Sequence, residues 1–202
     1  KVMEDHALDA YIVPSNDPHQ SEYVANHWKL RAWLSGFTGS AGIVVITRNA
    51  AGLWTDSRYF LQAETQLKDS GIQLHKLGNS RPPEHLYWLR DELPLKSRIG
   101  FDGQLFAVEQ VWQIEHKLEE KDTELVDVDL LSDLWLDRKP LPTDEVFELP
   151  TEAVGKSRHD KLMLVQQQLQ ERQIDFHLVT ALDDIAWLFN LRGKIGRASC
   201  RE

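Results

Sequence analysis

The sequence predicts an α/β fold, with a mixed β-sheet flanked by helices and followed by the truncated start of a second, similar domain. Three observations carry this prediction. Short apolar runs alternate with longer amphipathic patterns, which is typical of strands covered by helices. Two neighbouring runs are separated by a turn at Asn49-Ala50, which indicates an antiparallel hairpin within the sheet. The order of helix, strand and helix at the start of the chain recurs after Pro150, which indicates an internal duplication.

Four apolar runs in the first part of the chain predict strands, because each is bounded by residues that favour turns. These runs are AYIVP (10–14), GSAGIVVIT (39–47), AGLWT (51–55) and IQLHKL (72–77). Between them we expect the end of a helix over 2–10, one helix or two short ones over 20–37, and a helix over 57–69. In the last of these, Tyr59, Ala63 and Leu67 are spaced four apart, which places them on one helix face.

Two further helices, each followed by a strand, complete the first predicted domain. The helices are expected over 81–93, where Pro82 and Pro83 suit a first helical turn, and over 107–120. In each helix apolar residues are aligned: Leu86, Leu89 and Leu93 in the first, and approximately Val108, Val111, Trp112 and Leu118 in the second. The strands are expected at 97–103 and 123–129.

A segment rich in proline and acidic residues, 140–150, predicts a linker between two domains. It separates a first domain, 1–139, from the start of a second, related domain, 151–193. In the second domain we expect the same order of elements as at the beginning of the chain. These elements are a helix over 156–173, a strand over 175–180 and a helix over 182–193.

Both ends of the chain have unusual sequences. The chain opens on Lys1 inside a helical pattern, so we expect the natural start to lie upstream. The last residues, 194–202, have no apolar period and resemble a translated sequencing-adapter read-through joined to a truncated gene. We interpret them as a non-native tail, which removes Cys200 from any functional argument.

Composition excludes several classes of function. The net charge of −9 argues against a nucleic-acid surface, because phosphate binding needs clustered Lys and Arg. The sequence has no signal-peptide pattern and no run of about 18 apolar residues, so no membrane partner is expected. A single cysteine allows no internal disulfide, which favours a reducing, cytoplasmic location.

The motifs that would indicate a reaction centre are missing from the sequence. No two of the eight histidines lie three to five residues apart, and no H-E-x-x-H pattern occurs, so no metal site is expected. The glycine-rich stretch 36–42 runs into a strand rather than a helix and lacks a Walker lysine, which favours a tight turn over a phosphate loop. Ser40 lacks the G-x-S-x-G setting of a nucleophile.

Arg58 is the one residue whose position needs explanation. Asp56 or Ser57 is a suitable N-cap for the expected helix, so Arg58 falls in the first helical turn. The positive end of the helix dipole disfavours a cation there by about 0.3–1 kcal/mol. From the residues alone two explanations remain open, namely a salt bridge to Asp56 or another nearby carboxylate, and a negatively charged ligand in front of the guanidinium.

Four stretches carry a resemblance to a known family. They are AYIVPSNDPHQSEYVA (10–25), RAWLSGFTGSAG (31–42), LWTDSRYFLQAE (53–64) and LDDIAWLFNLRG (182–193). Together they resemble the N-terminal region of cytosolic-type Xaa-Pro aminopeptidase (aminopeptidase P), with its creatinase-like N-terminal domain. The resemblance runs in order over 2–193.

The resemblance implies a three-domain parent enzyme. Two related N-terminal α/β domains would precede a C-terminal "pita-bread" catalytic domain, absent from this chain, which carries two divalent metal ions, typically manganese. Such enzymes are metal-dependent and remove the N-terminal residue of a peptide whose second residue is proline. The family's ligands, two Asp, one His and two Glu, lie in that catalytic domain. We therefore expect no catalytic residue and no metal ligand in this fragment, no activity of the fragment alone, and a homodimer at full length.

One site residue follows from the resemblance. The family's WTDGRYF motif places an arginine at the edge of the active site, where it contacts the bound peptide. In this sequence that arginine is Arg58, so the resemblance implies that its planar guanidinium faces carbonyl or carboxylate oxygens of the substrate. Ser57 stands where the family commonly has glycine. If that position required a positive φ, serine would cost on the order of 1 kcal/mol and could change the direction of Arg58.

Two alternatives remain at this stage. A creatinase-type hydrolase shares the N-terminal domain and acts on a small guanidino compound, but it should have only one such domain. A non-catalytic binding or assembly module would use the α/β domain only for contacts between subunits. The metal ligands of the downstream sequence would distinguish a peptidase from such a module.

Overall fold

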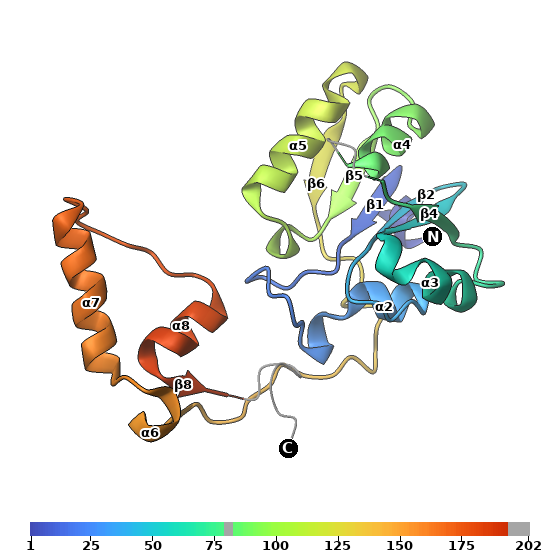
Figure 1. Ribbon diagram of the computed structural model, residues 1–202. Helices are drawn as coiled ribbons and strands as arrows, with labels where there is room; N and C mark the ends of the chain where they lie inside the picture. The colour runs from blue at the N-terminus through green and yellow to red at the C-terminus, as the bar shows by residue number, and fades with distance from the viewer. Residues whose placement is uncertain (79–82, 194–202) are drawn as a thin grey trace. The chain divides into compact units, whose positions relative to one another are not determined.

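The computed structural model describes residues 1–78 and 83–193. The chain forms two compact units, Lys1–Pro140 (unit 1) and Leu141–Glu202 (unit 2), and Figure 1 shows the elements of each. Pro82, expected at a helix start, and the interpreted tail 194–202 with Cys200 lie outside the described residues.

A six-stranded mixed sheet forms the centre of unit 1. Its strands are β1 (Ala10–Val13), β2 (Ile43–Thr47), β3 (Ala51–Thr55), β4 (Gln73–Lys76), β5 (Arg98–Phe101) and β6 (Glu124–Asp127), in the order β4-β3-β2-β1-β5-β6. Strand β2 is antiparallel to both of its neighbours, and the other neighbouring strands are parallel. The predicted mixed α/β fold and its hairpin are therefore confirmed.

Short helices connect the strands of unit 1. The α-helices are α1 (Val2–Asp5), α2 (Leu30–Ser35), α3 (Phe60–Gln66), α4 (Glu84–Glu92) and α5 (Val108–Leu118). Single 3₁₀ turns are η1 (Asn26–Trp28), η2 (Ser57–Tyr59), η3 (Gly103–Leu105) and η4 (Glu119–Lys121). The predicted helix over 57–69 thus begins with a 3₁₀ turn, η2, before α3.

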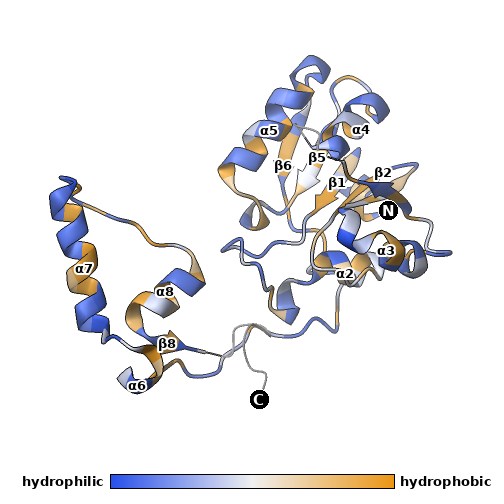
Figure 2. Cartoon of the chain, in the orientation of Figure 1, coloured by the Kyte–Doolittle hydropathy of each residue, from blue (hydrophilic) through white to orange (hydrophobic). Residues whose placement is uncertain are grey.

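The sheet separates two hydrophobic cores, because successive strand residues point to opposite faces. Tyr11 and Val13 of β1 enter the core that Leu30 of α2 and Ala63 of α3 also line. The intervening Ala10 and Ile12 belong to the other core, which Leu86, Leu89 and Leu93 of the α4 region and Ile114 and Leu118 of the α5 region complete. Figure 1 shows α4 and α5 on one side of the sheet and α2 and α3 on the other, and Figure 2 shows the apolar strands between them.

The predicted apolar face of α5 is partly wrong. Val108 and Trp112 are both 62% exposed, whereas Ile114 and Leu118 are buried and Val111 packs beside them. At 3.6 residues per turn the last three residues form one stripe, and Val108 and Trp112 lie to the side of it. The prediction from the sequence had assigned residues of two different helix faces to a single apolar face.

Unit 2 is a small assembly of helices with a two-stranded ribbon. It contains β7 (Phe147–Glu148), α6 (Thr151–Val154), α7 (Arg158–Glu171), α8 (Leu182–Phe189) and β8 (Leu191–Arg192), and β7 pairs antiparallel with β8. Buried Lys161 joins α7 to the end of α8 by donating to the Trp187 carbonyl at 2.8 Å and to Asn190 Oδ1 at 2.6 Å. Because β7 pairs with β8, the end of the segment expected as a linker belongs to unit 2.

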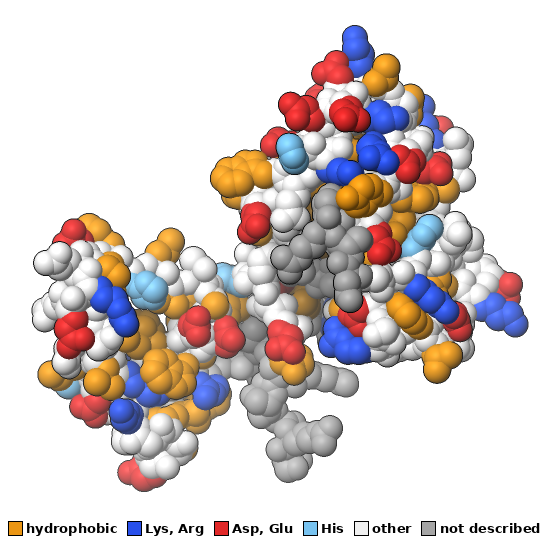
Figure 3. Space-filling model, turned by 45° about the horizontal axis from the view of Figure 1, so that its top comes forward, with side chains coloured by type: hydrophobic (Ala, Val, Ile, Leu, Met, Phe, Trp, Pro, Cys, Tyr) orange, Lys and Arg blue, Asp and Glu red, His pale blue; other side chains and the backbone are white. Residues whose placement is uncertain are grey.

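The strand expected over 175–180 is not formed. Phe176 is 91% exposed and Leu178 is 85% exposed, and the only pairing described in unit 2 joins β7 to β8. A strand needs a hydrogen-bonded neighbour, so an apolar run without one stays irregular. Hydrophobic side chains consequently reach the surface of unit 2 among charged ones (Figure 3).

Candidate functional site

The site implied by Arg58 lies at one edge of the sheet of unit 1. The carboxyl ends of the parallel strands β1, β3, β5 and β6 meet at this edge, which is where ligands bind in open α/β sheets. The glycine-rich segment 36–42 reaches the same edge before entering β2. Two hydrogen bonds attach it to the neighbouring strand ends. Ser15 Oγ donates to the Gly42 carbonyl at 2.5 Å, and Thr55 Oγ1 donates to the Ala41 carbonyl at 2.6 Å.

Asp56 caps η2 and holds Arg58. One carboxylate oxygen accepts from the backbone N–H of Arg58 at 3.0 Å, which confirms Asp56 as the N-cap. The same carboxylate accepts from Arg58 Nε at 2.9 Å and Nη2 at 2.8 Å, a bidentate pair. These bonds to the guanidinium lower the pKa of Asp56 below its usual value. The salt bridge to Asp56, one of the two explanations left open for Arg58, is therefore formed. The Arg58 side chain nevertheless remains 66% exposed.

Ser57 introduces no backbone strain at this corner. It is the first residue of η2, and its φ is not among the positive values found in the described residues. The backbone of Ser57 therefore does not occupy the left-handed region that favours glycine. The difference from the family's usual glycine does not redirect Arg58 through the backbone.

Arg31 supports the glycine-rich segment from the interior, and sequence reasoning missed it. Its side chain lies on α2, is only 5% exposed, and donates from Nη1 to the Phe37 carbonyl at 3.2 Å and from Nη2 to the Gly39 carbonyl. Burial lowers the pKa of Arg31 to about 10, because it disfavours the charged form. The available signal was a cation in a mostly apolar helix directly before a loop whose carbonyls need donors.

Tyr59 packs against the glycine-rich segment. Its hydroxyl and Ser40 Oγ are hydrogen-bonded at 2.6 Å, and its ring meets that of Phe37 edge to face with centroids 6.0 Å apart. A side chain at Gly39 would place its Cβ 2.8 Å from the Tyr59 ring, so this position requires glycine. Ser40 therefore has a structural partner, and the segment is an irregular connection, bent at 40–41, that leads into strand β2 as predicted rather than into a helix.

The described residues do not provide a metal centre. Within them no group of three or more His, Cys, Asp or Glu side chains is placed to hold an ion. Two histidines lie instead in an aromatic cluster: His75 stacks on Trp54 with ring centroids 4.2 Å apart, and His85 is packed near Trp54 and is 9% exposed. Burial lowers the pKa of both histidines, and that of His85 to about 4.

We expect His85 to make unit 1 less stable at acidic pH. Its proton is bound more tightly in the unfolded chain than in the fold, so the free energy of unfolding falls as the pH drops below the unfolded value near 6.5 towards about 4. Between pH 7.5 and 4.5 the loss from this group is about 2–3 kcal/mol. Urea unfolding of wild type and His85→Gln at both pH values measures it. The variant should lose less stability on acidification, whereas His116→Gln, at a 90% exposed side chain, should behave as wild type. Equal pH dependence in all three proteins would contradict this account.

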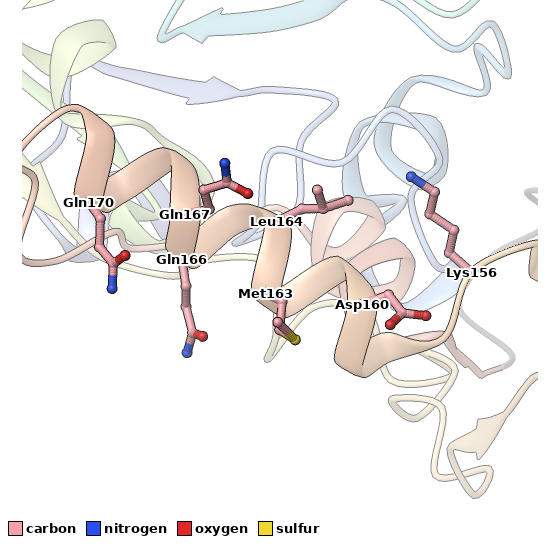
Figure 4. Close-up of a pocket in the computed structure, with 7 residues that line it drawn as sticks. All are labelled: Lys156, Asp160, Met163, Leu164, Gln166, Gln167 and Gln170. Carbon is pink, nitrogen blue, oxygen red and sulfur yellow. The ribbon is translucent and has the colours of Figure 1, made fainter.

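Arg58 lines neither of two hollows found among the described residues. One hollow, of about 580 Å³, runs along α7, where Figure 4 shows seven residues along the helix, from Gln170 to Lys156 just before its start. The other, of about 460 Å³, lies in unit 1 beside α1 and is lined mainly by apolar side chains such as Met3 and Leu131. Neither brings together a set of chemically reactive groups. Arg58 instead presents its guanidinium on an open edge.

Comparison with known proteins decides the family. Models of the creatinase/prolidase N-terminal domain match residues 1–134 and 137–194. The chain belongs to this family. Aminopeptidase P2 of Arabidopsis thaliana is 40% identical over 190 residues, covering 92% of this chain and 27% of that protein. Xaa-Pro aminopeptidase ApepP of Drosophila melanogaster is 42% identical over 197 residues, covering 96% of this chain and 32% of that protein.

A solved structure shows the same fold for this creatinase/prolidase N-terminal region. X-prolyl aminopeptidase from Caenorhabditis elegans, described as a cytosolic enzyme with a di-nuclear active site, has a TM-score of 0.83 and 35% identity. The match covers 94% of this chain and 31% of that protein. This chain thus spans about a third or less of the length of each of these three proteins. The resemblance to the N-terminal region of Xaa-Pro aminopeptidases is confirmed. In the described parts of the chain, no helix combines the length and apolar character that crossing a membrane requires.

Proposed function

We propose that this creatinase/prolidase N-terminal region belongs to a metal-dependent Xaa-Pro aminopeptidase, which removes the first residue from peptides with proline at position two. The observation that carries the proposal is the match in sequence and fold to such enzymes over nearly the whole chain, with 42% identity to the fly protein and a TM-score of 0.83 to the nematode structure. The parent would act in the cytoplasm as a homodimer with two divalent metal ions, the manganese that the family typically uses. The isolated fragment would be inactive.

The part of this chain in the reaction is to bind and orient the peptide. The described residues do not fit a dinuclear centre, so we assign no chemical step to them. Arg58 stands, with its guanidinium exposed, at the edge formed by the carboxyl ends of the parallel strands, and open α/β sheets generally bind ligands at such an edge. Asp56 occupies Nε and Nη2, and Nη1 has no hydrogen bond to any described residue. This outer side of the fork is suited to a carbonyl or carboxylate oxygen of the substrate.

The proposal is tested with the full-length protein that contains this region. Supplied with Mn²⁺, it should cleave a peptide with proline at position two and leave a matched peptide with alanine at that position intact. EDTA should abolish cleavage, and the present chain alone should show none with or without the metal. Equal cleavage of both peptides would contradict Xaa-Pro specificity. Binding of the proline peptide without cleavage would favour a non-catalytic binding module instead.

A further inference from the structure

Tyr59 connects Arg58 to the glycine-rich segment 36–42. The Arg58 guanidinium lies over the Tyr59 ring, 5.1 Å from its centroid, and the ring is half-buried. On the other side the Tyr59 hydroxyl is hydrogen-bonded to Ser40 at 2.6 Å, and the ring packs on Phe37. The exposed Arg58 side chain thus packs on the Tyr59 ring, which is itself fixed by contacts with the glycine-rich segment.

The segment beneath Tyr59 is itself fixed by several contacts. Arg31 donates to the carbonyls of Phe37 and Gly39 from the interior. Helix α3 holds the intervening Thr38, whose N–H donates to Gln66 Oε1 at 3.0 Å. Gln62 and Gln66 also donate to Thr38 Oγ1, at 3.0 and 2.9 Å. The segment therefore has little freedom to shift when the surface binds a ligand.

Two contacts together determine the direction of the Arg58 fork. The bidentate pair with Asp56 fixes the direction of the guanidinium within its plane, and the Tyr59 ring fixes the tilt of that plane. A guanidinium ordered before the ligand arrives loses less side-chain entropy on binding. We propose that Tyr59 is a positioning residue for Arg58, and that the glycine-rich segment fixes Tyr59 in place. This inference rests on the proposed substrate contact of Arg58.

The test is a double-mutant cycle in the full-length enzyme with a peptide that has proline at position two. Tyr59→Leu should raise KM by about two- to fivefold and leave kcat unchanged, because a cation–π contact at an exposed site is lost. In the Arg58→Ala background the same substitution should have no further effect. Tyr87→Leu is the matched control, since Tyr87 is half-buried and lies under the Arg90 guanidinium at 5.4 Å, and it should leave KM unchanged.

Each other outcome has a distinct meaning. If Tyr59→Leu also raised KM in the Arg58→Ala background, the positioning role would be overturned. It would also be overturned if Arg58→Ala raised KM and Tyr59→Leu alone did not. An unchanged KM in Arg58→Ala would overturn the proposed substrate contact itself. If Tyr59→Leu does not fold, Tyr59→Phe and Ser40→Ala each remove the 2.6 Å hydrogen bond and keep the ring. Tyr59→Phe and Ser40→Ala should raise KM equally, and the variant that combines both should raise it no further. An unchanged KM in both single variants would overturn the inference.

Discussion

Replacing Trp54 by alanine is expected to lower the free energy of unfolding of unit 1 by about 3–5 kcal/mol. Trp54 lies on β3, is 1% exposed, and belongs to the core that α4 and α5 cover. Its ring stacks on His75 and meets Trp88 at a centroid distance of 5.1 Å, so the substitution removes packed surface and leaves a cavity. Urea unfolding followed by far-UV circular dichroism measures the loss without depending on tryptophan fluorescence.

The control for Trp54 is a tryptophan of the same unit on the surface. Trp112 on α5 is 62% exposed, so Trp112→Ala should change the free energy of unfolding by no more than about 0.5 kcal/mol. If the two alanine variants lost similar stability, the assignment of Trp54 to the core and of Trp112 to the surface would be wrong.

Replacing Arg58 by alanine is expected to lower kcat/KM of the full-length enzyme by about 10- to 100-fold, the range for a hydrogen bond to a charged group. The loss should fall mainly on KM, because the contact is made with the bound peptide away from the reacting bond. Steady-state kinetics on a peptide with proline at position two measures it. The free energy of unfolding should change little, since the Arg58 pair with Asp56 is exposed to solvent.

Arg90 provides the matched control for Arg58. It also pairs with a neighbouring carboxylate, Asp91, through Nε at 2.9 Å and Nη2 at 2.8 Å, and it also lies over a tyrosine ring. It lies in the last turn of α4, which covers a face of the sheet, whereas Arg58 comes directly after the end of strand β3. Arg90→Ala should therefore leave kcat/KM unchanged. Equal losses in the two variants would show that a surface ion pair, and not substrate contact, accounts for the effect.

Much of the fold of unit 1 could be predicted because its strongest local signals agree with its packing. The residues of β1 are buried on both faces of the sheet, so the strand reads as one continuous apolar run. The turn at Asn49-Ala50 joins β2 and β3 in the predicted hairpin. Leu86, Leu89 and Leu93, predicted to share one face, all enter the same core.

The errors arose where local pattern and tertiary environment differ. Val108 and Trp112 fit a loose helical spacing, but the sheet selects a neighbouring stripe of α5 for burial. The run 175–180 has the composition of a strand, yet it has no paired strand in the described residues. The buried face of α5 and the pairing of 175–180 both depend on which other elements pack beside them, and this cannot be deduced from a single sequence.

In the candidate site, too, the features set by local sequence were predictable and those set by tertiary contacts were not. The capping role of Asp56 is local and was predictable from residue type and position. The residue pair that explains Arg58 chemically was also predicted, as one of two open explanations. Arg31 and Tyr59 were missed as parts of the site because their roles depend on contacts with the segment 36–42, formed only on folding.

The central claim is that Arg58 contacts the peptide, and equilibrium binding tests it most directly. An Xaa-Pro peptide in which a methylene-amine replaces the scissile amide can be titrated into the full-length wild-type protein, Arg58→Ala and Arg90→Ala. We predict a Kd about tenfold or more higher for Arg58→Ala and an unchanged Kd for Arg90→Ala. The same Kd for all three folded proteins would contradict the claim and leave Arg58 as the partner of Asp56 alone.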